Sequence, residues 1–287
     1  MSANTADWTD PDEALDLNNI RRSLQRMEDS IIFSLIERSQ YRVNRAVYQP
    51  NYQKLSKFHL HQLRMSGSDG SLGDWFIYQT ECLHAQVRRY SHPTEFAFFG
   101  PLPEPTLGAG EPEAKAPILA PVPREAVING RLLEIYRQSI VPTLCEEGDD
   151  GNYGSTSVQD VHCLQTMATR IYFGLFVAES KFRSERETAT ALIKARDRDG
   201  LMAFITKPEV ERKNVQRVVL KARTFSQTIA SAEGGQQVPD SSSQTSYKVN
   251  PEFVGRVFEE WIMPLTKDVE VEYLLARLDG EPSAESR

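Results

Sequence analysis

The sequence has no apolar run long enough to cross a membrane and no excess of positive charge. Its longest uncharged apolar stretch, Ile171 to Ala178, is far shorter than the roughly 20 residues that a membrane-spanning helix needs. Lys and Arg number 33 against 40 Asp and Glu, and the net charge of -7 argues against a general nucleic-acid or anionic-membrane binder. The first thirty residues lack a basic segment followed by an apolar one, so we expect no signal peptide and a cytoplasmic protein.

Motifs for metals, nucleotides and covalent catalysis are also missing. The three cysteines, Cys82, Cys145 and Cys163, lie far apart without a CxxC pair, which favours neither a disulfide framework nor a thiolate metal site. His59 and His61 form an HxH pair without a third ligand at a suitable spacing, and a pair of loop histidines is the plainer interpretation. The chain has no Walker loop, no GxGxxG and no GxSxG. We therefore expect neither a metal nor a cofactor.

Helical periodicity dominates what is present in these 287 residues. Asp10, Pro11 and Glu13 combine an N-cap oxygen, a proline at the first helical position and a capping-box acid. Steps of three and four then place on one stripe the residues Ile20, Leu24, Met27, Ile31 and Leu35. The pattern predicts a helix over residues 11–44.

Further helices are predicted over 72–90, 127–146, 157–182, 185–204, 208–232 and 251–278. No stretch alternates with strand period for long. Residues 101–123 are rich in proline and 234–247 in Ser, Gln and Gly, so both are expected to be long surface loops. The sequence predicts an all-α fold without significant sheet, a bundle of about a dozen helices that forms one domain over residues 1–287. Residues 1–10 and 279–287 are expected to be flexible.

An apolar helical segment from Cys163 to Phe182 carries two cations, Arg170 and Lys181. Their spacing of eleven residues is close to three helical turns, so both side chains point the same way, about 16 Å apart along the axis. Gly174 lies between them on that side and leaves room for a small ligand. Two solvated cations on an exposed edge would produce the same pattern, and the spacing does not decide between the two interpretations.

Four more polar residues are ambiguous in the same way. Thr266 and Glu270 lie four residues apart and share a helix face, which would also suit a solvated acidic edge. Arg21 is adjacent to the stripe of the first helix, and Glu211 lies one turn into the helix that begins at Pro208. Only a fold could bring these residues together.

Three long segments resemble the eukaryotic all-helical chorismate mutases, especially the fungal ones. They are Arg26–Gln40, Gly154–Phe182 and Pro264–Leu278, and the similarity extends from about Leu15 to Leu278. The resemblance implies a cytosolic helical homodimer that converts chorismate to prephenate, on the route to phenylalanine and tyrosine. This intramolecular Claisen rearrangement needs no nucleophile, metal or redox cofactor, which agrees with the missing motifs.

The resemblance also implies that chorismate is bound by Arg21, Arg170, Lys181, Glu211, Thr266 and Glu270. Two guanidinium groups, those of Arg21 and Arg170, match the two carboxylates of the substrate. Lys181 would stabilise the negative charge that builds on the ether oxygen, and a protonated Glu270 would donate a second hydrogen bond there. Arg170, Lys181 and Glu270 are the expected catalytic residues, and Glu211 is expected to bind the substrate hydroxyl.

Regulated members of this family are inhibited by tyrosine and activated by tryptophan at sites between the subunits. The resemblance places the effector site at Arg88, Arg89, Asn152, Gly154 and Ser155. Adjacent arginines and a glycine turn would suit an amino-acid carboxylate. Without the resemblance, the two arginines would be interpreted as the solvated end of a helix.

Three positions depart from the fungal pattern. Lys207 replaces an asparagine at the start of the helix that carries Glu211, so a side-chain contact to the substrate there is in doubt, whereas a backbone contact would survive. Val158 replaces a threonine near the effector site. Asn250 replaces a threonine before the last helix but remains a good N-cap, so the helix start should persist.

Two other functions compete with this interpretation. A non-catalytic helical dimer could keep the fold and bind aromatic amino acids or a partner protein, although the retained charged residues count against such decay. A metal-dependent terpenoid synthase would need a DDxxD helix. Asp149 and Asp150 instead lie in a turn flanked by glycines.

Overall fold

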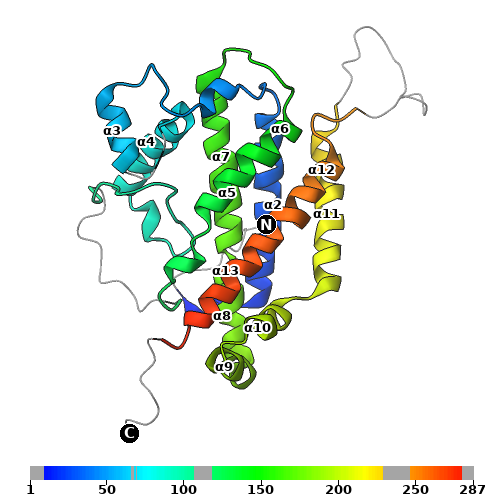
Figure 1. Cartoon of the computed structure of the whole chain (residues 1–287). Helices are drawn as coiled ribbons and strands as arrows, with labels where there is room; N and C mark the ends of the chain where they lie inside the picture. The colour runs from blue at the N-terminus through cyan, green and yellow to red at the C-terminus, as the bar shows by residue number, and fades with distance from the viewer. Residues whose placement is uncertain (1–9, 66–67, 69, 107–117, 229–245, 280–287) are drawn as a thin grey trace, which may run out of the picture.

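The computed structural model describes residues 10–65, 68, 70–106, 118–228 and 246–279, and they form a helical bundle (Figure 1). Within these ranges the only strand-like pairing is an isolated bridge between Gln227 and Tyr247. The predicted all-α class is thus confirmed. The predicted flexible tail 1–10 falls almost wholly outside the described residues, as do most of 234–247 and 279–287 and the middle of 101–123.

The elements are α1 (Pro11–Ala14), α2 (Leu17–Arg38), the 3-10 helix η1 (Arg45–Tyr48), α3 (Lys57–Met65), α4 (Leu72–Gln86), η2 (Arg89–Ser91), η3 (Arg124–Ala126), α5 (Asn129–Ile135), the π segment η4 (Tyr136–Ile140), α6 (Val141–Leu144), α7 (Tyr153–Tyr172), α8 (Gly174–Ser184), α9 (Arg186–Lys194), α10 (Arg198–Ile205), α11 (Pro208–Ser226), α12 (Pro251–Arg256), the π segment η5 (Val257–Ile262) and α13 (Met263–Ala276). Helices α2 and α7 run through the bundle, and α11 packs on α2 and α12 at its edge (Figure 1). Helix α13 packs on α7 and α8, and α9 and α10 close one end.

The predicted first helix is wrong in extent, because it is broken near its start and ends early. Asp10 caps α1 as predicted, with its Oδ1 accepting from the Asp12 N–H at 2.9 Å. Asp16 then caps a second helix, accepting from the N–H groups of Asn18 at 3.0 Å and Asn19 at 2.9 Å. A side-chain acceptor that satisfies free N–H groups favours a new helix start over continuation.

The predicted helix over 157–182 is two helices, α7 and α8, which meet at Phe173. Helix α7 also begins earlier than predicted, at Tyr153. Helix α3 was missed, and it carries His59 and His61, which were expected in a loop. It spans only nine residues, which is too short for a repeating apolar pattern to mark it in the sequence, and Leu63 is its one buried apolar side chain.

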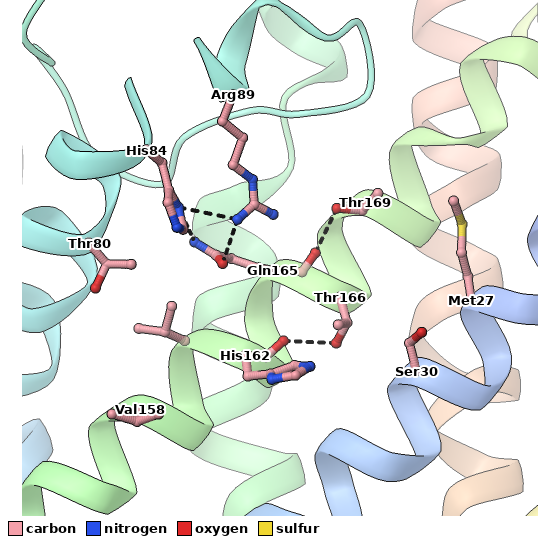
Figure 2. A pocket seen from close by; sticks show the side chains of 11 residues that line it. Met27, Ser30, Thr80, His84, Arg89, Val158, His162, Gln165, Thr166 and Thr169 are labelled. Carbon is pink, nitrogen blue, oxygen red and sulfur yellow. Dashed lines mark hydrogen bonds between the residues drawn. The ribbon is translucent and has the colours of Figure 1, made fainter. Parts of the chain in front are cut away.

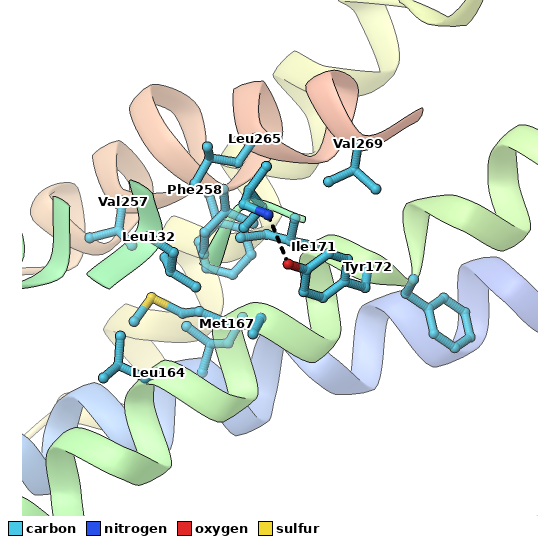
Figure 3. Close-up of a cluster of buried hydrophobic side chains, with 14 of the residues drawn as sticks. Leu132, Leu164, Met167, Ile171, Tyr172, Val257, Phe258, Leu265 and Val269 are labelled. Atoms are coloured by element: carbon cyan, nitrogen blue, oxygen red, sulfur yellow. Dashed lines mark hydrogen bonds between the residues drawn. The ribbon is translucent and has the colours of Figure 1, made fainter. Parts of the chain in front are cut away.

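One cluster of buried apolar side chains joins the helices, with α7 at its centre (Figure 3). Leu164, Met167 and Ile171 of α7 are almost fully buried. Tyr172 donates from its hydroxyl to Asn129 Oδ1 at 2.8 Å and accepts from the Ile128 N–H at 2.9 Å. Because each large apolar side chain contributes roughly 1.5 to 3 kcal/mol on burial, this cluster fixes the position of the polar residues carried by α7.

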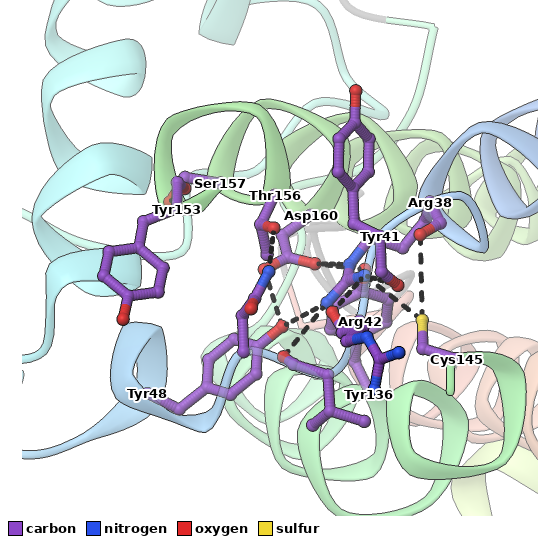
Figure 4. Close-up of polar contacts among 12 residues, drawn as sticks. Arg38, Tyr41, Arg42, Tyr48, Tyr136, Cys145, Tyr153, Thr156, Ser157 and Asp160 are labelled. Carbon is purple, nitrogen blue, oxygen red and sulfur yellow. Dashed lines mark hydrogen bonds and ion pairs between the residues drawn. The ribbon is translucent and has the colours of Figure 1, made fainter. Parts of the chain in front are cut away.

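A buried ion pair ties α2 to α7 (Figure 4). Arg38 Nε donates to Asp160 Oδ1 at 2.6 Å, and neither side chain is exposed to any extent. The hydroxyls of Tyr48 and Tyr136 each donate to Asp160 at 2.7 Å. The carboxylate is therefore fully satisfied, which is the condition for tolerating a charge in a core.

We expect Asp160→Asn to lower the free energy of unfolding by about 3 kcal/mol, because the Arg38 guanidinium would keep its buried charge without a counter-ion. Urea titration followed by circular dichroism measures the change. The matched control is Glu147→Gln, which removes the exposed partner of Arg45 at 2.8 Å and should change stability by less than about 1 kcal/mol. Equal effects of the two substitutions would contradict the prediction.

Candidate active site

Helix α13 turns its hydroxyl and carboxyl pair into the bundle. Thr266 is 8% exposed and Glu270 is 6% exposed, so the solvated acidic edge is not what this helix forms. Thr266 Oγ1 donates to the Ile262 carbonyl at 2.7 Å, which fixes the side-chain rotamer. The face shared by these two residues packs against α8.

Arg170 lies on α7, three residues before the helix break at Phe173, and is 7% exposed. Its Nε has no hydrogen-bond partner among the described residues. Burial lowers the pKa of Arg170, while the negative charges of Glu28 and Glu270 act in the opposite direction. Since arginine stays protonated at physiological pH, the site holds a buried cation with an unused donor.

Lys181 lies on α8, beyond the break. Its ammonium donates to the Phe204 carbonyl and lies over the Phe204 ring, 4.3 Å from the centroid. Burial lowers the pKa of Lys181, and Lys207 lowers it further, whereas Glu185 and Glu270 raise it. Two of the three ammonium donors remain for another partner.

The room predicted beside Gly174 is filled. A Cβ built on Gly174 would lie 2.7 Å from Thr266 Cγ2 and 3.0 Å from Glu270 Oε1. Because α7 and α8 are separate helices, Arg170 and Lys181 do not face one gap along a single axis, as the eleven-residue spacing predicted. What the two cations share is the Glu270 carboxyl, because the positive charge of each acts on the pKa of Glu270.

Burial raises the pKa of Glu270 to about 8. Glu211 raises it as well, and Arg170, Lys181 and Lys267 lower it without cancelling the effect of burial. A carboxyl with such a pKa is mostly protonated at neutral pH and can donate a hydrogen bond. The site thus offers two buried or half-buried cations beside a neutral carboxylic acid.

Glu211 lies in the first turn of α11, where Lys267 of α13 donates to its carboxylate at 3.2 Å. Lys207 precedes the helix and contributes no side-chain cap. Its carbonyl accepts from the N–H groups of Val210 at 2.9 Å and Glu211 at 3.1 Å. The backbone at this position is therefore fixed by the helix start and does not depend on which side chain residue 207 has.

Arg21 is exposed on α2, and no described contact joins it to the other candidate residues. It lies seven residues before Glu28, nearly two helical turns, so both share one face of α2. The hydroxyl of Ser180 on α8 donates to the Leu15 carbonyl at 2.8 Å, which holds the start of α2 beside the helix of Lys181. The structure thus places Arg21 on the α2 face of Glu28, and the described contacts do not join it to Arg170, Lys181 or Glu270.

Sequence reasoning missed Glu28, which is 2% exposed. Arg217 of α11 donates to both of its oxygens, at 3.0 and 2.5 Å, and the Lys221 ammonium lies 3.0 Å from Oε2. Glu28 also acts on the charge of Arg170. The only sign of Glu28 in the sequence was a charge next to the apolar stripe of the first helix. Its partners Arg217 and Lys221 are about 190 residues away, so no local pattern could reveal the pairing.

The predicted effector residues form two separate groups in one chain. Arg88 has a left-handed backbone with φ 62°, and Arg89 donates to Gln165 at 2.9 Å and to Glu95 at 3.1 Å. Arg89 lines a hollow of about 440 Å³ between α2, α4 and α7 (Figure 2).

Asn152, Gly154 and Ser155 lie at the other end of α7, where all three are exposed. Ser155 is ten residues before Gln165, about 15 Å along the helix axis. One chain therefore does not bring the two groups into a single site. Asn250, in contrast, caps α12 as predicted, accepting from the Glu252 N–H at 2.9 Å.

None of the described helices is long and apolar enough to cross a membrane. Over the same ranges, no group of three or more His, Cys, Asp and Glu side chains could hold a metal ion.

Comparison with known proteins gives the family. Residues 152–271 match the family model described as Chorismate mutase type II. Chorismate mutase 1, chloroplastic, from Petunia hybrida is 43% identical over 271 residues, which cover 94% of this chain and 78% of the relative. The crystal structure of the Candida albicans chorismate mutase in complex with L-Trp has a TM-score of 0.82 and 38% identity, covering 96% of this chain and 97% of that one. The structure of AtCM1 with tyrosine bound in its allosteric site has a TM-score of 0.74 and 41% identity, covering 94% and 99%.

The similarity extends over nearly the whole chain in sequence and in fold, and it includes the helices that carry Arg170, Lys181 and Glu270. The chain therefore belongs to the eukaryotic, all-helical chorismate mutase family.

Proposed function

We propose that this chorismate mutase binds chorismate between α2, α7, α8, α11 and α13, at Arg21, Arg170, Lys181, Glu211, Thr266 and Glu270. The single observation that carries the assignment is the position of Glu270, a buried carboxyl with a raised pKa within electrostatic reach of both Arg170 and Lys181. A buried cluster of this kind is costly to stability and is typical of a functional site.

The proposed mechanism is selection of a compact substrate conformer followed by stabilisation of the transition state. Arg21 and Arg170 bind the two carboxylates and hold the reacting ends close together. As the C–O bond breaks, negative charge grows on the ether oxygen, where Lys181 and protonated Glu270 donate hydrogen bonds. Both donors act in a site shielded from water, so their effect on the growing charge is larger than in bulk solvent.

The function is tested with purified protein by following the loss of chorismate absorbance without added metal or cofactor. We expect conversion to prephenate. A folded protein that leaves chorismate unchanged would overturn the proposed site and favour a binding role.

Glu211 is assigned to the substrate hydroxyl, a contact that is equally strong in the ground state and the transition state. We therefore expect Glu211→Gln to raise KM about 10-fold while kcat changes little. Glu209→Gln, in the same helical turn but on the surface beside Arg212 at 2.6 Å, is the control and should leave both constants unchanged. A fall in kcat at constant KM would contradict this role.

We infer that tyrosine inhibits this enzyme and tryptophan activates it. The solved relatives support the inference, since the Candida albicans enzyme holds L-Trp and AtCM1 holds tyrosine in an allosteric site. Gln165, the α7 residue that accepts from Arg89, lies about 15 Å along the helix axis from Ser155, so we infer that an effector which touches both groups needs two chains. We propose a homodimer in which one subunit supplies Arg88 and Arg89 and the other supplies Asn152, Gly154 and Ser155.

Exposed apolar side chains on α4 and α7 support a dimer interface on this part of the molecule. Leu83 on α4 and Val87, the residue after its end, are 62% and 50% exposed, and Val158, which lines the hollow of Figure 2, is 49% exposed. Adjacent exposed apolar residues of this kind favour association with another chain. Sedimentation would show a species of twice the 32.5 kDa chain mass, and a monomer that still responds to tyrosine would overturn the shared site.

We expect Arg89→Ala to weaken inhibition by tyrosine at least 10-fold while the rate without effector stays the same, because the effector carboxylate loses a guanidinium. Chorismate saturation curves at several tyrosine concentrations measure the change. Arg64→Ala, which removes an exposed arginine on α3, is the control. Unaltered inhibition of the Arg89 variant would disprove the assignment.

We further propose that the enzyme acts in the cytosol. The three cysteines are unpaired, as expected for a reducing compartment, whereas the Petunia relative is named as chloroplastic. Cell fractionation with an antibody against the chain decides between the two locations.

A further inference from the structure

Helix α8 begins with a glycine that touches the two site residues of α13. Gly174 is buried, and it directly follows Phe173, where α7 ends and the chain turns into α8. A Cβ at this position would lie 2.7 Å from Thr266 Cγ2, 3.0 Å from Glu270 Oε1 and 3.1 Å from Glu270 Cγ. Such separations are shorter than van der Waals contact, so the side chains of α13 occupy the space that any other residue 174 would fill.

Neither α13 side chain is free to move aside. Thr266 is β-branched, and its hydroxyl is bound to the Ile262 carbonyl at 2.7 Å, which leaves its methyl group pointing at Gly174. Glu270 is buried among Arg170, Lys181 and Lys267, whose charges act on its carboxyl. The carboxyl therefore lies against the bare backbone of Gly174, in a buried position where the charges of these cations act on it.

We propose that Gly174 is a positioning residue for the rearrangement: the absence of its side chain lets α8 and α13 approach closely enough to place the Glu270 carboxyl at the ether oxygen of chorismate. The inference rests on the proposed role of Glu270. A methyl group at residue 174 would push this carboxyl, or the whole of α13, away from its place by a few tenths of an ångström or more. Errors of about 1 Å in catalytic geometry lower rates by up to 100-fold.

The test is Gly174→Ala, assayed for kcat, KM and the pH dependence of kcat. We expect kcat to fall about 30-fold with KM changed less than about threefold, because Glu270 acts chiefly in the transition state. We also expect the alkaline limb of the pH profile to shift, because a displaced Glu270 carboxyl would have a different burial and different charges around it, and hence a different pKa. A purely structural role would lower the melting temperature and leave the profile of the folded fraction unchanged.

Gly255→Ala is the matched control. Gly255 is also a buried helical glycine, with a built Cβ only 2.6 Å from Val219 Cγ2, and it joins α12 to α11. It should lower stability to a similar extent while kcat per folded molecule and its pH profile are retained. Equal losses of kcat in both variants, or no loss in the Gly174 variant, would overturn the proposal.

A second substitution tests whether the loss of activity comes from crowding between residue 174 and α13. Thr266→Ser removes the methyl at 2.7 Å and keeps the hydroxyl, while the contacts of a residue-174 Cβ with Glu270 remain, so the pair Gly174→Ala with Thr266→Ser should recover only about 5-fold in kcat over Gly174→Ala alone and stay below Thr266→Ser. If Gly174→Ala yields no folded protein, the pair is compared with Thr266→Ser alone, and an unchanged kcat there would overturn the proposal.

Glu270→Gln in the otherwise wild-type enzyme tests the role of Glu270 separately from that of Gly174. An altered pH profile in that variant together with an unaltered Gly174→Ala enzyme would disprove only the role of Gly174. An unaltered profile in Glu270→Gln would remove the role of Glu270 and the inference with it.

Discussion

Arg170→Ala is expected to lower kcat/KM about 1000-fold, which corresponds to about 4 kcal/mol. The guanidinium is buried, and its Nε has no partner in the described part of the chain, so it is available to a substrate carboxylate. Truncating one side of a buried, hydrogen-bonded charge pair typically costs about 2 to 5 kcal/mol, and here the substrate carboxylate would be the group left unpaired. The loss should therefore appear in both KM and kcat, since Arg170 binds the substrate and also holds its reacting conformer.

Arg170→Lys separates charge from geometry. A lysine keeps the positive charge but loses the planar fork that matches a carboxylate, so we expect at least a 10-fold loss to remain. The fold should persist in both variants, because Glu28 keeps Arg217 and Lys221 as partners. Arg131→Ala, which breaks the surface pair with Asp268 at 2.8 Å, is the control. Near wild-type kcat/KM in Arg170→Ala, with the melting temperature unchanged, would refute the assigned role.

The second large effect is a loss of activity in mildly alkaline solution. Burial raises the pKa of Glu270 to about 8, so its carboxyl is protonated and able to donate below that pH and becomes an unprotonated acceptor above it. We expect kcat/KM to fall about 10-fold for each pH unit above the pKa. The bound dianion should raise the pKa of Glu270 further, so the limb of kcat should lie at higher pH than that of kcat/KM.

Glu270→Gln should flatten this limb, because an amide donates at every pH. Burial lowers the pKa of Lys181, so a second limb is expected to remain in this variant where the Lys181 ammonium loses its charge. The matched control is Glu272→Gln on the same helix, whose carboxylate pairs with Arg198 at 2.6 Å and should leave the profile unchanged. Rates of both variants are measured from pH 5 to 10 in buffers of constant ionic strength. A Gln variant that keeps the wild-type alkaline limb would eliminate Glu270 as the titrating group.

The sequence predicted the helices better than their interruptions. The all-α class and the caps at Asp10 and Asn250 followed from periodicity and side-chain chemistry, which act over one or two turns. The break at Phe173 carries no proline, so the local pattern gave no sign of it. Helix α3 spans only nine residues, so its apolar pattern was too short to predict a helix.

The sequence by itself determined which residues are chemically suited to the site and, through the family resemblance, what reaction they serve. Whether Thr266 and Glu270 form a solvated edge or a buried pair depended on the packing of α13 against α8, which no periodicity in α13 alone specifies. The raised pKa of Glu270, the pairing of Glu28 with Arg217 and the close contact at Gly174 were likewise decided by the tertiary structure. Burial and charge act through space between helices far apart in the chain, whereas helical propensity acts between neighbours.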